Sequence, residues 1–304
     1  MVLPVTDPPE VDLPRTQVGA NPQNLVAGLF VDYWFRPEEP LPSAALVALL
    51  GEFGVSAAGA RAAIARVARR GVLQLSRRGR RTYYTMTAGA ARALEQPQRR
   101  MMEFGSGKGD WDGIWTTVIY SVPEDQRELR YTLRRRLRFL GYGPMYDGVW
   151  VSPRADHQQT VELLGSVDVR NATVLRGEVT YSANGGDPLT AWDLDTIEMA
   201  YRQFLTEFGP LGDRVAQGLV GPAEALVART TIKELWLEVV SSDPELPDNL
   251  LPADWPGAAG RRLFAGVYDG LGPIAEARVR QLLAQHDPDL VPRTGHRTTA
   301  EAWD

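Results

Sequence analysis

The spacing of apolar residues predicts two short helices near the start of the chain. Asn21–Phe35 carries apolar residues at helical intervals, and Asn21 followed by Pro22 supplies a cap and a first helical position. Ser43–Phe53 has a similar pattern and is followed by Gly54, which is typical of a helix end. Both segments therefore contribute apolar faces to one small core.

A third helix is predicted immediately downstream. Ser56 is suited to the N-cap, the helix continues to Arg69, and Gly71 is a natural stop. The residues expected to form its buried stripe are Ala60, Ile64, Val67, Ala68 and Gly71.

A β-hairpin follows this helix. Val72, Leu73 and Leu75 favour a strand, and Thr82–Thr85 favours the return strand. The turn is expected at Arg77–Arg80, where Gly79 supplies a positive φ. The order of three helices and a hairpin is that of a winged helix-turn-helix, and Ala88–Phe104 is predicted to leave it as an exit helix.

The middle of the chain alternates between strand-like and helix-like segments. In order of sequence these segments are Trp115–Tyr120, Glu124–Leu140, Met145–Val151, His157–Leu164 and Ala172–Thr180. The first helix has an apolar stripe that consists of Leu129, Leu133, Leu137 and Leu140. Strand and helix alternation of this kind indicates a ferredoxin-like domain.

The last third is predicted to be mostly helical. Its helices are expected at Trp192–Phe208, Ala223–Val240, Arg261–Tyr268 and Pro273–Gln285. Gly209-Pro210 and Gly221-Pro222 are expected to break the helices, and four prolines make Asp243–Gly257 an ordered loop.

These elements indicate a multidomain α+β protein. The expected parts are a disordered tail (1–20), a winged-helix DNA-binding domain with its exit helix (21–104), a linker (105–112), a ferredoxin-like central domain (113–182), a helical C-terminal domain (183–286) and a polar tail (287–304).

The distribution of charge singles out one segment. The whole chain has a net charge of −5, but residues 56–100 contain eleven arginines and one acidic residue, so this segment carries +10 and the remainder −15. Such asymmetry is expected when one face neutralises phosphates. Because Lys108 and Lys233 are the only lysines, arginine is the default base here, and the clustering carries more weight than the residue type.

We therefore expect this segment to contact double-stranded DNA. The candidate residues on the helix and the hairpin are Ser56, Arg61, Ala62, Ala65, Arg66, Arg69, Arg77, Arg78, Arg80 and Arg81. The alternative is a solvated basic surface without a ligand, which either feature alone would equally suit.

A second group of arginines lies on the helix predicted at Glu124–Leu140. It permits three interpretations, which are a solvated face, a further contact with the DNA backbone, and a site for a phosphorylated ligand. The candidates for phosphate binding in an effector are Arg134, Arg135 and Arg138.

The sequence gives little support for nucleotide binding, metal binding or catalysis. Phe104–Asp110 contains Gly-Lys but lacks the remaining residues of a phosphate-binding loop, and the glycines favour a flexible joint. His157, His286 and His296 are isolated, cysteine is absent, and no catalytic motif assembles. We expect no enzyme, no metal, no bound cofactor, no membrane span and no secretion signal, which favours a cytoplasmic protein.

Three segments carry a resemblance to a known family. They are ARVARRGVL with RRGRRTYYTMT (65–73 and 77–87), ELRYTLRRRLRFLGYGPMYDGVWVSP (128–153) and LPDNLLPADWPG (246–257). With them, the region from about Asn21 to Gln285 resembles the PaaX family of bacterial transcriptional repressors of phenylacetic acid degradation.

The resemblance implies a winged helix, a central ferredoxin-like domain similar to a CRISPR-associated endonuclease subunit, and a helical C-terminal domain. It also implies a homodimer on palindromic operators, which an aryl- or acyl-CoA thioester such as phenylacetyl-CoA releases. The endonuclease relatives carry a catalytic Asp near the end of the first strand, where this chain has Tyr120, Ser121 and Val122. The alternatives are a metal-dependent nuclease and a scaffold that binds CoA thioesters without a DNA function.

Overall fold

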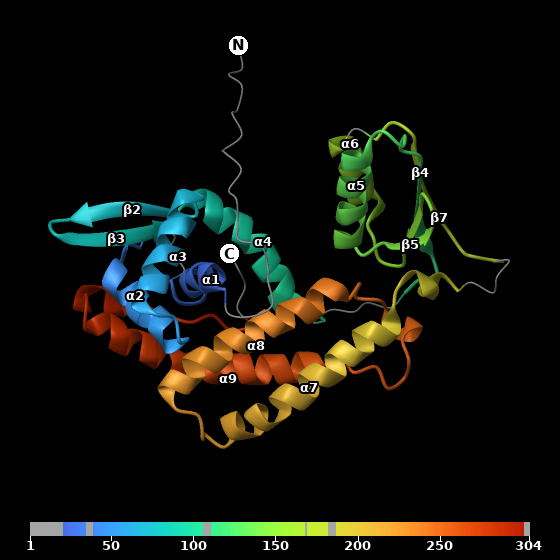
Figure 1. Cartoon of the computed structure of the whole chain (residues 1–304). Helices are drawn as coiled ribbons and strands as arrows, with labels where there is room; N and C mark the ends of the chain where they lie inside the picture. The colour runs from blue at the N-terminus through green and yellow to red at the C-terminus, as the bar shows by residue number, and fades with distance from the viewer. Residues whose placement is uncertain (1–20, 35–38, 106–110, 168, 182–186, 301–304) are drawn as a thin grey trace, which may run out of the picture. The chain divides into compact units, whose positions relative to one another are not determined.

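The structure is a computed structural model, and it describes residues 21–34, 39–105, 111–167, 169–181 and 187–300 (Figure 1). The predicted tail at 1–20, the Gly-rich residues 106–110 and the end of the polar tail at 301–304 lie outside these residues. The chain divides into two compact units. The first unit contains Met1–Glu103, Thr206–Trp236 and Arg262–Asp304, and the second contains Phe104–Leu205 and Leu237–Arg261.

The first unit begins with three helices, α1 (Pro22–Tyr33), α2 (Ser43–Glu52) and α3 (Ala57–Arg69). Asn21 caps α1 as predicted, because its side chain accepts a hydrogen bond from the backbone N–H of Gln23 at 3.0 Å. The direction of the chain turns by 119° between α2 and α3, across a four-residue connection. The two helices are thus joined by a short connection and cross at a steep angle.

A three-stranded antiparallel sheet completes this region. The hairpin consists of β2 (Leu73–Arg78) and β3 (Arg81–Met86), and Gly79 has the positive φ, 60°, that the turn requires. A third strand, β1 (Leu41–Pro42), pairs with β3, but it is too short to be predicted from its pattern. The exit helix α4 (Ala88–Glu103) follows the hairpin as predicted.

The C-terminal helices are longer than their sequence predicts. They are α7 (Leu194–Ala216), α8 (Pro222–Ser242) and α9 (Gly257–Ala284). Gly221-Pro222 ends the connection before α8, whereas the prediction of a break at Gly209-Pro210 is wrong. Pro210 cannot donate to the carbonyl group of Thr206, and because Thr206 is exposed, this loss costs less than it would in the core.

A further prediction about the C-terminal region is wrong. The helices expected on either side of residue 270 form one helix, α9, which contains Pro273. The segment predicted to be a polar tail includes, in its described residues, the 3-10 helix η3 (Pro288–Arg293), in which Leu290 is buried. Apolar burial and interactions such as the ion pair between Arg293 and Glu39 explain why this polar segment is ordered.

Aromatic side chains form much of the core where α8 meets α9. The rings of Trp236 and Phe264 stack at 4.9 Å, and those of Phe264 and Tyr268 stack at 5.3 Å. All three side chains are fully buried. The indole N–H of Trp236 donates to the backbone carbonyl of Met101, which joins α8 to the exit helix α4 at 3.2 Å.

The second unit contains one four-stranded antiparallel sheet. Its elements are β4 (Trp115–Tyr120), α5 (Arg127–Phe139), β5 (Gly143–Tyr146), β6 (Val149–Ser152), α6 (His157–Ser166) and β7 (Ala172–Gly177). The strand order is β5-β6-β4-β7, and α5 and α6 lie on the same face (Figure 1). This β-α-β-β-α-β arrangement is ferredoxin-like.

Two boundaries in this unit differ from prediction. The single strand expected at Met145–Val151 is a hairpin, because Asp147-Gly148 forms a turn with Gly148 at φ 73°. A Cβ atom at Gly148 would lie 2.5 Å from the carbonyl oxygen of Tyr120, so the turn requires glycine for space as well as conformation. Helix α5 begins at Arg127 rather than Glu124, because Pro123–Gln126 closes a separate turn.

Two short 3-10 helices complete the second unit, η1 (Pro188–Ala191) and η2 (Asp248–Leu250). The predicted loop at Asp243–Gly257 is ordered, and its Leu246 is buried. The Tyr201 hydroxyl donates a hydrogen bond to Asp243 Oδ2 at 2.6 Å, and this bond fixes the start of the loop. No single described helix is long and apolar enough to cross a membrane; only the strongly bent pair of α2 and α3 meets that test jointly.

Candidate nucleic-acid interface

Helix α3 presents its apolar side to the core and its basic side to solvent. Ser56 caps the helix, since its Oγ accepts a hydrogen bond from the N–H of Gly59 at 3.1 Å. The buried residues are Ala60, Ala63, Ile64 and Val67. The predicted buried stripe is therefore partly wrong, because Ala68 is only half-buried and Gly71 is exposed. Gly71 instead ends the helix, with a positive φ of 75°.

The candidate contact residues of α3 lie on the opposite side of the helix. Arg61, Arg66 and Arg69 are exposed, as are Ser56 and Ala62, whereas Ala65 is half-buried. The helix has small side chains in its first turn, Arg61 at the start of its second turn, and Arg66 and Arg69 in its last turn. This face offers close approach at one end and positive charge at the other.

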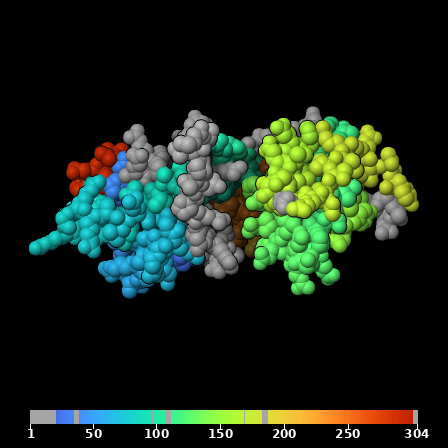
Figure 2. All heavy atoms as spheres, turned by 90° about the horizontal axis from the view of Figure 1, so that it is seen from above, coloured from blue at the N-terminus to red at the C-terminus, as the bar shows by residue number. Residues whose placement is uncertain are grey.

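The hairpin carries four exposed arginines at its tip, which protrudes from the surface of the first unit (Figure 2). The structure divides them into two pairs. The guanidinium of Arg78 lies over the ring of Tyr83 at 5.0 Å, and Arg81 donates to the carbonyl of His286 at 3.2 Å. Arg77 and Arg80 have no such contact with any described residue.

We call Arg61, Arg66, Arg69, Arg77 and Arg80 the basic face. Among the described residues, none of these five arginines forms a salt bridge or a side-chain hydrogen bond. Their charges are therefore available to an anion in solution. A helix and a β-hairpin that both present unpaired arginines suit a polyanion better than a single small anion.

The arginines of α5 are arranged differently. Arg134 donates to Asp147 at 2.9 Å and to the Tyr120 hydroxyl at 3.3 Å, and that hydroxyl is the main reason why the pKa of Arg134 is raised. Arg135 and Arg138 lie over the rings of Tyr131 and Trp150, at 6.0 and 5.3 Å.

Two neighbouring arginines of α5 are also engaged, since Arg130 donates to the carbonyl of Val122 at 2.9 Å and Arg136 to Ser166 at 2.8 Å. These contacts tie α5 to its own domain. Each of Arg134, Arg135 and Arg138 contacts a different residue, and their role in effector binding stays a prediction.

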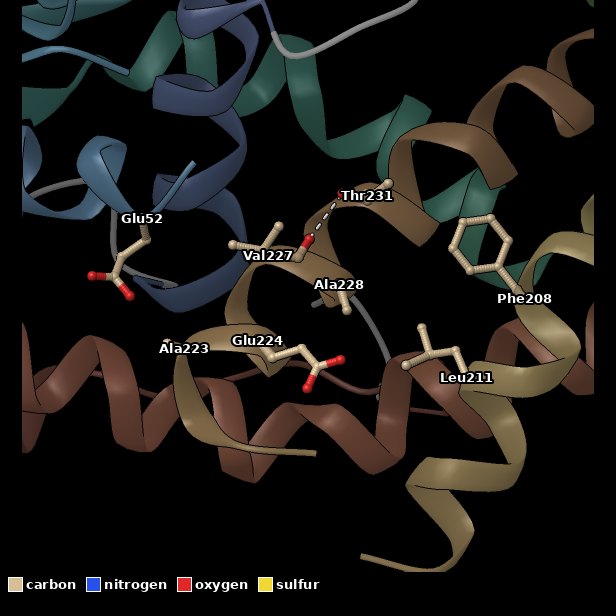
Figure 3. Close-up of a pocket in the computed structure, with 8 residues that line it drawn as sticks. All are labelled: Glu52, Phe208, Leu211, Ala223, Glu224, Val227, Ala228 and Thr231. Carbon is tan, nitrogen blue, oxygen red and sulfur yellow. Dashed lines mark hydrogen bonds between the residues drawn. The ribbon is translucent and has the colours of Figure 1, made fainter. Parts of the chain in front are cut away.

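An open groove lies in the first unit, with Glu52 at the end of α2 among its lining residues (Figure 3). Its lining residues are Glu52, Phe208, Leu211, Ala223, Glu224, Val227, Ala228 and Thr231. Glu52 forms two hydrogen bonds with Arg278, at 2.8 and 2.9 Å, and Glu224 pairs with Arg214 at 2.6 Å. The other residues that line the groove are mostly apolar. Each of its two carboxylates already has an arginine partner.

The described residues show no metal-binding group of three or more His, Asp or Glu side chains. His296 is paired with Glu276 rather than held in a cluster of ligands. At the end of β4, Tyr120–Val122 supplies no carboxylate.

Two residues near the interface, Tyr83 and Asp287, have a role that the sequence pattern does not indicate. Tyr83 was interpreted only as part of a strand, yet its hydroxyl donates to Asp287 at 3.0 Å. The two residues are 204 positions apart, and no local pattern indicates such a pairing.

The fold and this surface define a multidomain α+β protein with a basic helix and hairpin at one end of its chain. Comparison with known families identifies it further, and the chain belongs to the PaaX family. Residues 21–90 match the family described as PaaX-like protein, residues 108–188 match the PaaX protein central Cas2-like domain, and residues 192–281 match the PaaX-like protein C-terminal domain. The ferredoxin-like arrangement of the second unit agrees with the Cas2-like match.

Individual relatives agree with this assignment. The chain is 25% identical over 267 residues to the transcriptional repressor PaaX of Escherichia coli (strain K12), an alignment that covers 85% of this chain and 83% of the relative. Among solved structures, protein Rv0674 from Mycobacterium tuberculosis matches with a TM-score of 0.54 and 23% identity, covering 78% of this chain and 91% of that one. The latter similarity concerns the fold alone.

Proposed function

We propose that this protein is a transcriptional repressor that binds double-stranded DNA through a winged helix-turn-helix. In this proposal α2 and α3 are the helix-turn-helix pair, and the β2–β3 hairpin is the wing. Support comes from the 119° turn between the two helices, from the hairpin that follows them, and from the similarity to the transcriptional repressor PaaX of Escherichia coli. A repressor of this kind acts on DNA in the cytoplasm.

The basic face is the observation that carries the proposal. The major groove of B-DNA admits an α-helix, and the small residues in the first turns of α3 would permit close approach to base edges. Arg61, Arg66 and Arg69 would then reach the groove or its phosphates. Arg77 and Arg80 at the wing tip would contact the sugar-phosphate backbone, where each neutralised phosphate releases condensed counterions.

Selection of bound fragments from a library of genomic duplexes tests this proposal directly. We expect the wild-type protein to enrich fragments that share one sequence, with an affinity that falls steeply as salt rises. The same selection with a variant in which all five residues of the basic face are alanine is the control. Equal enrichment by the two proteins, or no enrichment by either, would contradict the proposal.

We further propose that the repressor is released by an aryl- or acyl-CoA thioester. The family resemblance supports this choice of ligand, and phenylacetyl-CoA is the first candidate. Release requires that the ligand bind the conformation that is incompetent for DNA more tightly than the competent one. A mobility-shift assay with a panel of aryl- and acyl-CoA thioesters, with free CoA as the control, should identify a member that dissociates the complex. A panel in which no thioester acts would remove this part of the proposal.

The oligomeric state proposed for DNA binding is a homodimer. A twofold-symmetric dimer presents two α3 helices to two half-sites of a palindrome. Light scattering of the DNA complex should give two chains for each duplex, and one chain on each duplex would exclude the dimer.

The Cas2-like match raises nuclease activity as a second candidate. No catalytic step is proposed for it, because Tyr120, Ser121 and Val122 provide no carboxylate at the end of β4. Incubation of the protein with Mg²⁺ and single- or double-stranded nucleic acid tests this. We expect the substrates to remain intact, and cleavage that copurifies with the protein would reverse the assignment.

A further inference from the structure

The hairpin is held by residues that follow the last long helix of the chain. Tyr83, which is 4% exposed, donates its hydroxyl to Asp287 Oδ2 at 3.0 Å. Beside it, Arg81 donates to the carbonyl oxygen of His286 at 3.2 Å. Both contacts join β3 to the segment between α9 and η3, and they lie within one compact unit.

Tyr83 also supports one of the exposed arginines at the hairpin tip. Its ring lies beneath the guanidinium of Arg78 at 5.0 Å, within the range of a cation–π contact. One side chain therefore carries an arginine on its ring while its hydroxyl is fixed to another part of the fold. Few side chains other than tyrosine can supply both contacts.

We propose that Tyr83 and Asp287 are positioning residues that set the hairpin at the height and angle required for DNA binding. This inference rests on the proposed function, since it assumes that the hairpin contacts DNA. In this arrangement Arg81 is a structural arginine, and Arg77 and Arg80 are left to contact phosphates. The region between α9 and η3 thereby determines how well a hairpin two hundred residues earlier can bind.

The charge of Asp287 makes the proposal distinguishable from simple electrostatics. A carboxylate beside a basic hairpin repels DNA phosphates, so its removal should strengthen DNA binding if charge were its only effect. If Asp287 positions the hairpin, its removal should instead weaken binding. The two explanations predict opposite signs for one measurement.

The first test compares Tyr83→Phe with Tyr84→Phe. Tyr84 is the next residue of β3, and its hydroxyl makes no hydrogen bond with another described residue. With duplex DNA that the wild-type protein selects from a random-sequence pool, we expect Tyr83→Phe to weaken binding about tenfold and Tyr84→Phe to leave it unchanged. Equal affinities for the two variants would overturn the proposal.

The second test compares Asp287→Ala with Asp289→Ala, which removes an equal charge from an exposed residue of η3. We expect Asp287→Ala to weaken binding about tenfold and Asp289→Ala to leave it unchanged or slightly tighter. Asp287→Asn keeps an acceptor oxygen and should bind like wild type. The double variant Tyr83→Phe/Asp287→Ala should be no weaker than Asp287→Ala, whereas additive losses would overturn the pairing.

A third measurement separates this inference from the proposed function. Hydrogen exchange without DNA should be faster in the β2–β3 amides of Tyr83→Phe than in those of Tyr84→Phe, because the hairpin loses a contact. If Arg77→Ala/Arg80→Ala fails to weaken DNA binding, the proposed role of the hairpin is wrong and this inference falls with it. If that pair weakens binding but Tyr83→Phe changes neither affinity nor exchange, the inference alone is wrong.

Discussion

The arginines of α3 and the hairpin differ from those of α5 in what they contact, although the two groups are similar in number. The basic face has five exposed arginines without a salt bridge among the described residues. On α5, by contrast, Arg130, Arg134, Arg136 and Arg138 each contact a group of their own domain. Clustering of arginine in a sequence therefore does not identify a binding surface, and the absence of internal partners is the better indicator.

Basic residues beneath the surface of the first unit provide a third case. Lys233 donates to both carboxylate oxygens of Asp32, at 2.6 and 2.7 Å, and both side chains are buried. Nearby, the guanidinium of the buried Arg229 lies 3.8 Å from the centre of the Tyr268 ring. These cations join α8 and α9 to α1, so their function is structural.

The largest effect on stability is expected from breaking the buried pair. Lys233→Met leaves the Asp32 carboxylate buried without its cation, which should lower the free energy of unfolding by about 3–5 kcal/mol. Urea denaturation measures this change. The control is Asp32→Leu/Lys233→Met, which removes both charges and should recover most of the loss. A double variant as unstable as Lys233→Met would show that the pair itself is stabilising.

The next largest effect concerns DNA binding. Arg77→Ala/Arg80→Ala should weaken affinity about 100-fold and reduce the slope of log K against log salt by about 2, since two phosphate contacts are lost. Fluorescence anisotropy over a range of salt concentrations measures both quantities. Folding should be unaffected, because neither side chain forms a hydrogen bond, an ion pair or a ring contact with a described residue. An unchanged salt slope would contradict the assignment of the hairpin tip to phosphates.

The corresponding change on α5 should lower the stability of the protein and leave DNA binding unchanged. Arg130→Ala/Arg134→Ala/Arg138→Ala removes contacts to Val122, Asp147 and Trp150, and should lower the free energy of unfolding by about 1–3 kcal/mol. DNA affinity and its salt slope should not change. A loss of DNA affinity comparable to that of the hairpin variant would show that α5 is a second DNA-binding surface.

The smallest effect is expected from Asp147→Asn. It removes the acidic partner of Arg134, but Asp147 is 95% exposed in its side chain, so the free energy of unfolding should change by no more than about 0.5 kcal/mol. DNA affinity should also stay the same, even though Arg134 then has no acidic partner in this contact. Tighter DNA binding by this variant would show that pairing alone had kept α5 from contacting DNA.

Local sequence patterns predicted most elements that depend on a few neighbouring residues. The caps at Asn21 and Ser56 and the turn at Gly79 occur where their side chains or their conformations require them. The same local reasoning failed at Pro210 and Pro273, which stay inside helices. A proline penalty of about 3 kcal/mol can be offset when a long helix packs along its whole length.

Burial within the candidate interface was also predicted only in part. The helical spacing located Ala60, Ile64 and Val67 on the core side of α3, but it assigned Ala68 there in place of Ala63. The hairpin arginines were expected to act alike, and Arg81 proved to contact the carbonyl of His286. Such differences depend on distant parts of the chain that spacing within one helix or one hairpin does not include.

Sequence alone predicts the three helices and the β2–β3 hairpin of the N-terminal region, their caps and turns, and the concentration of positive charge between residues 56 and 100. Each of these follows from side chains within a few positions of one another. Folding decides which arginines have partners, because several of those partners lie in other elements of the fold, as His286 does for Arg81. Availability to a ligand is a property of what surrounds a charge in the folded chain, and it separates the basic face from the arginines of α5.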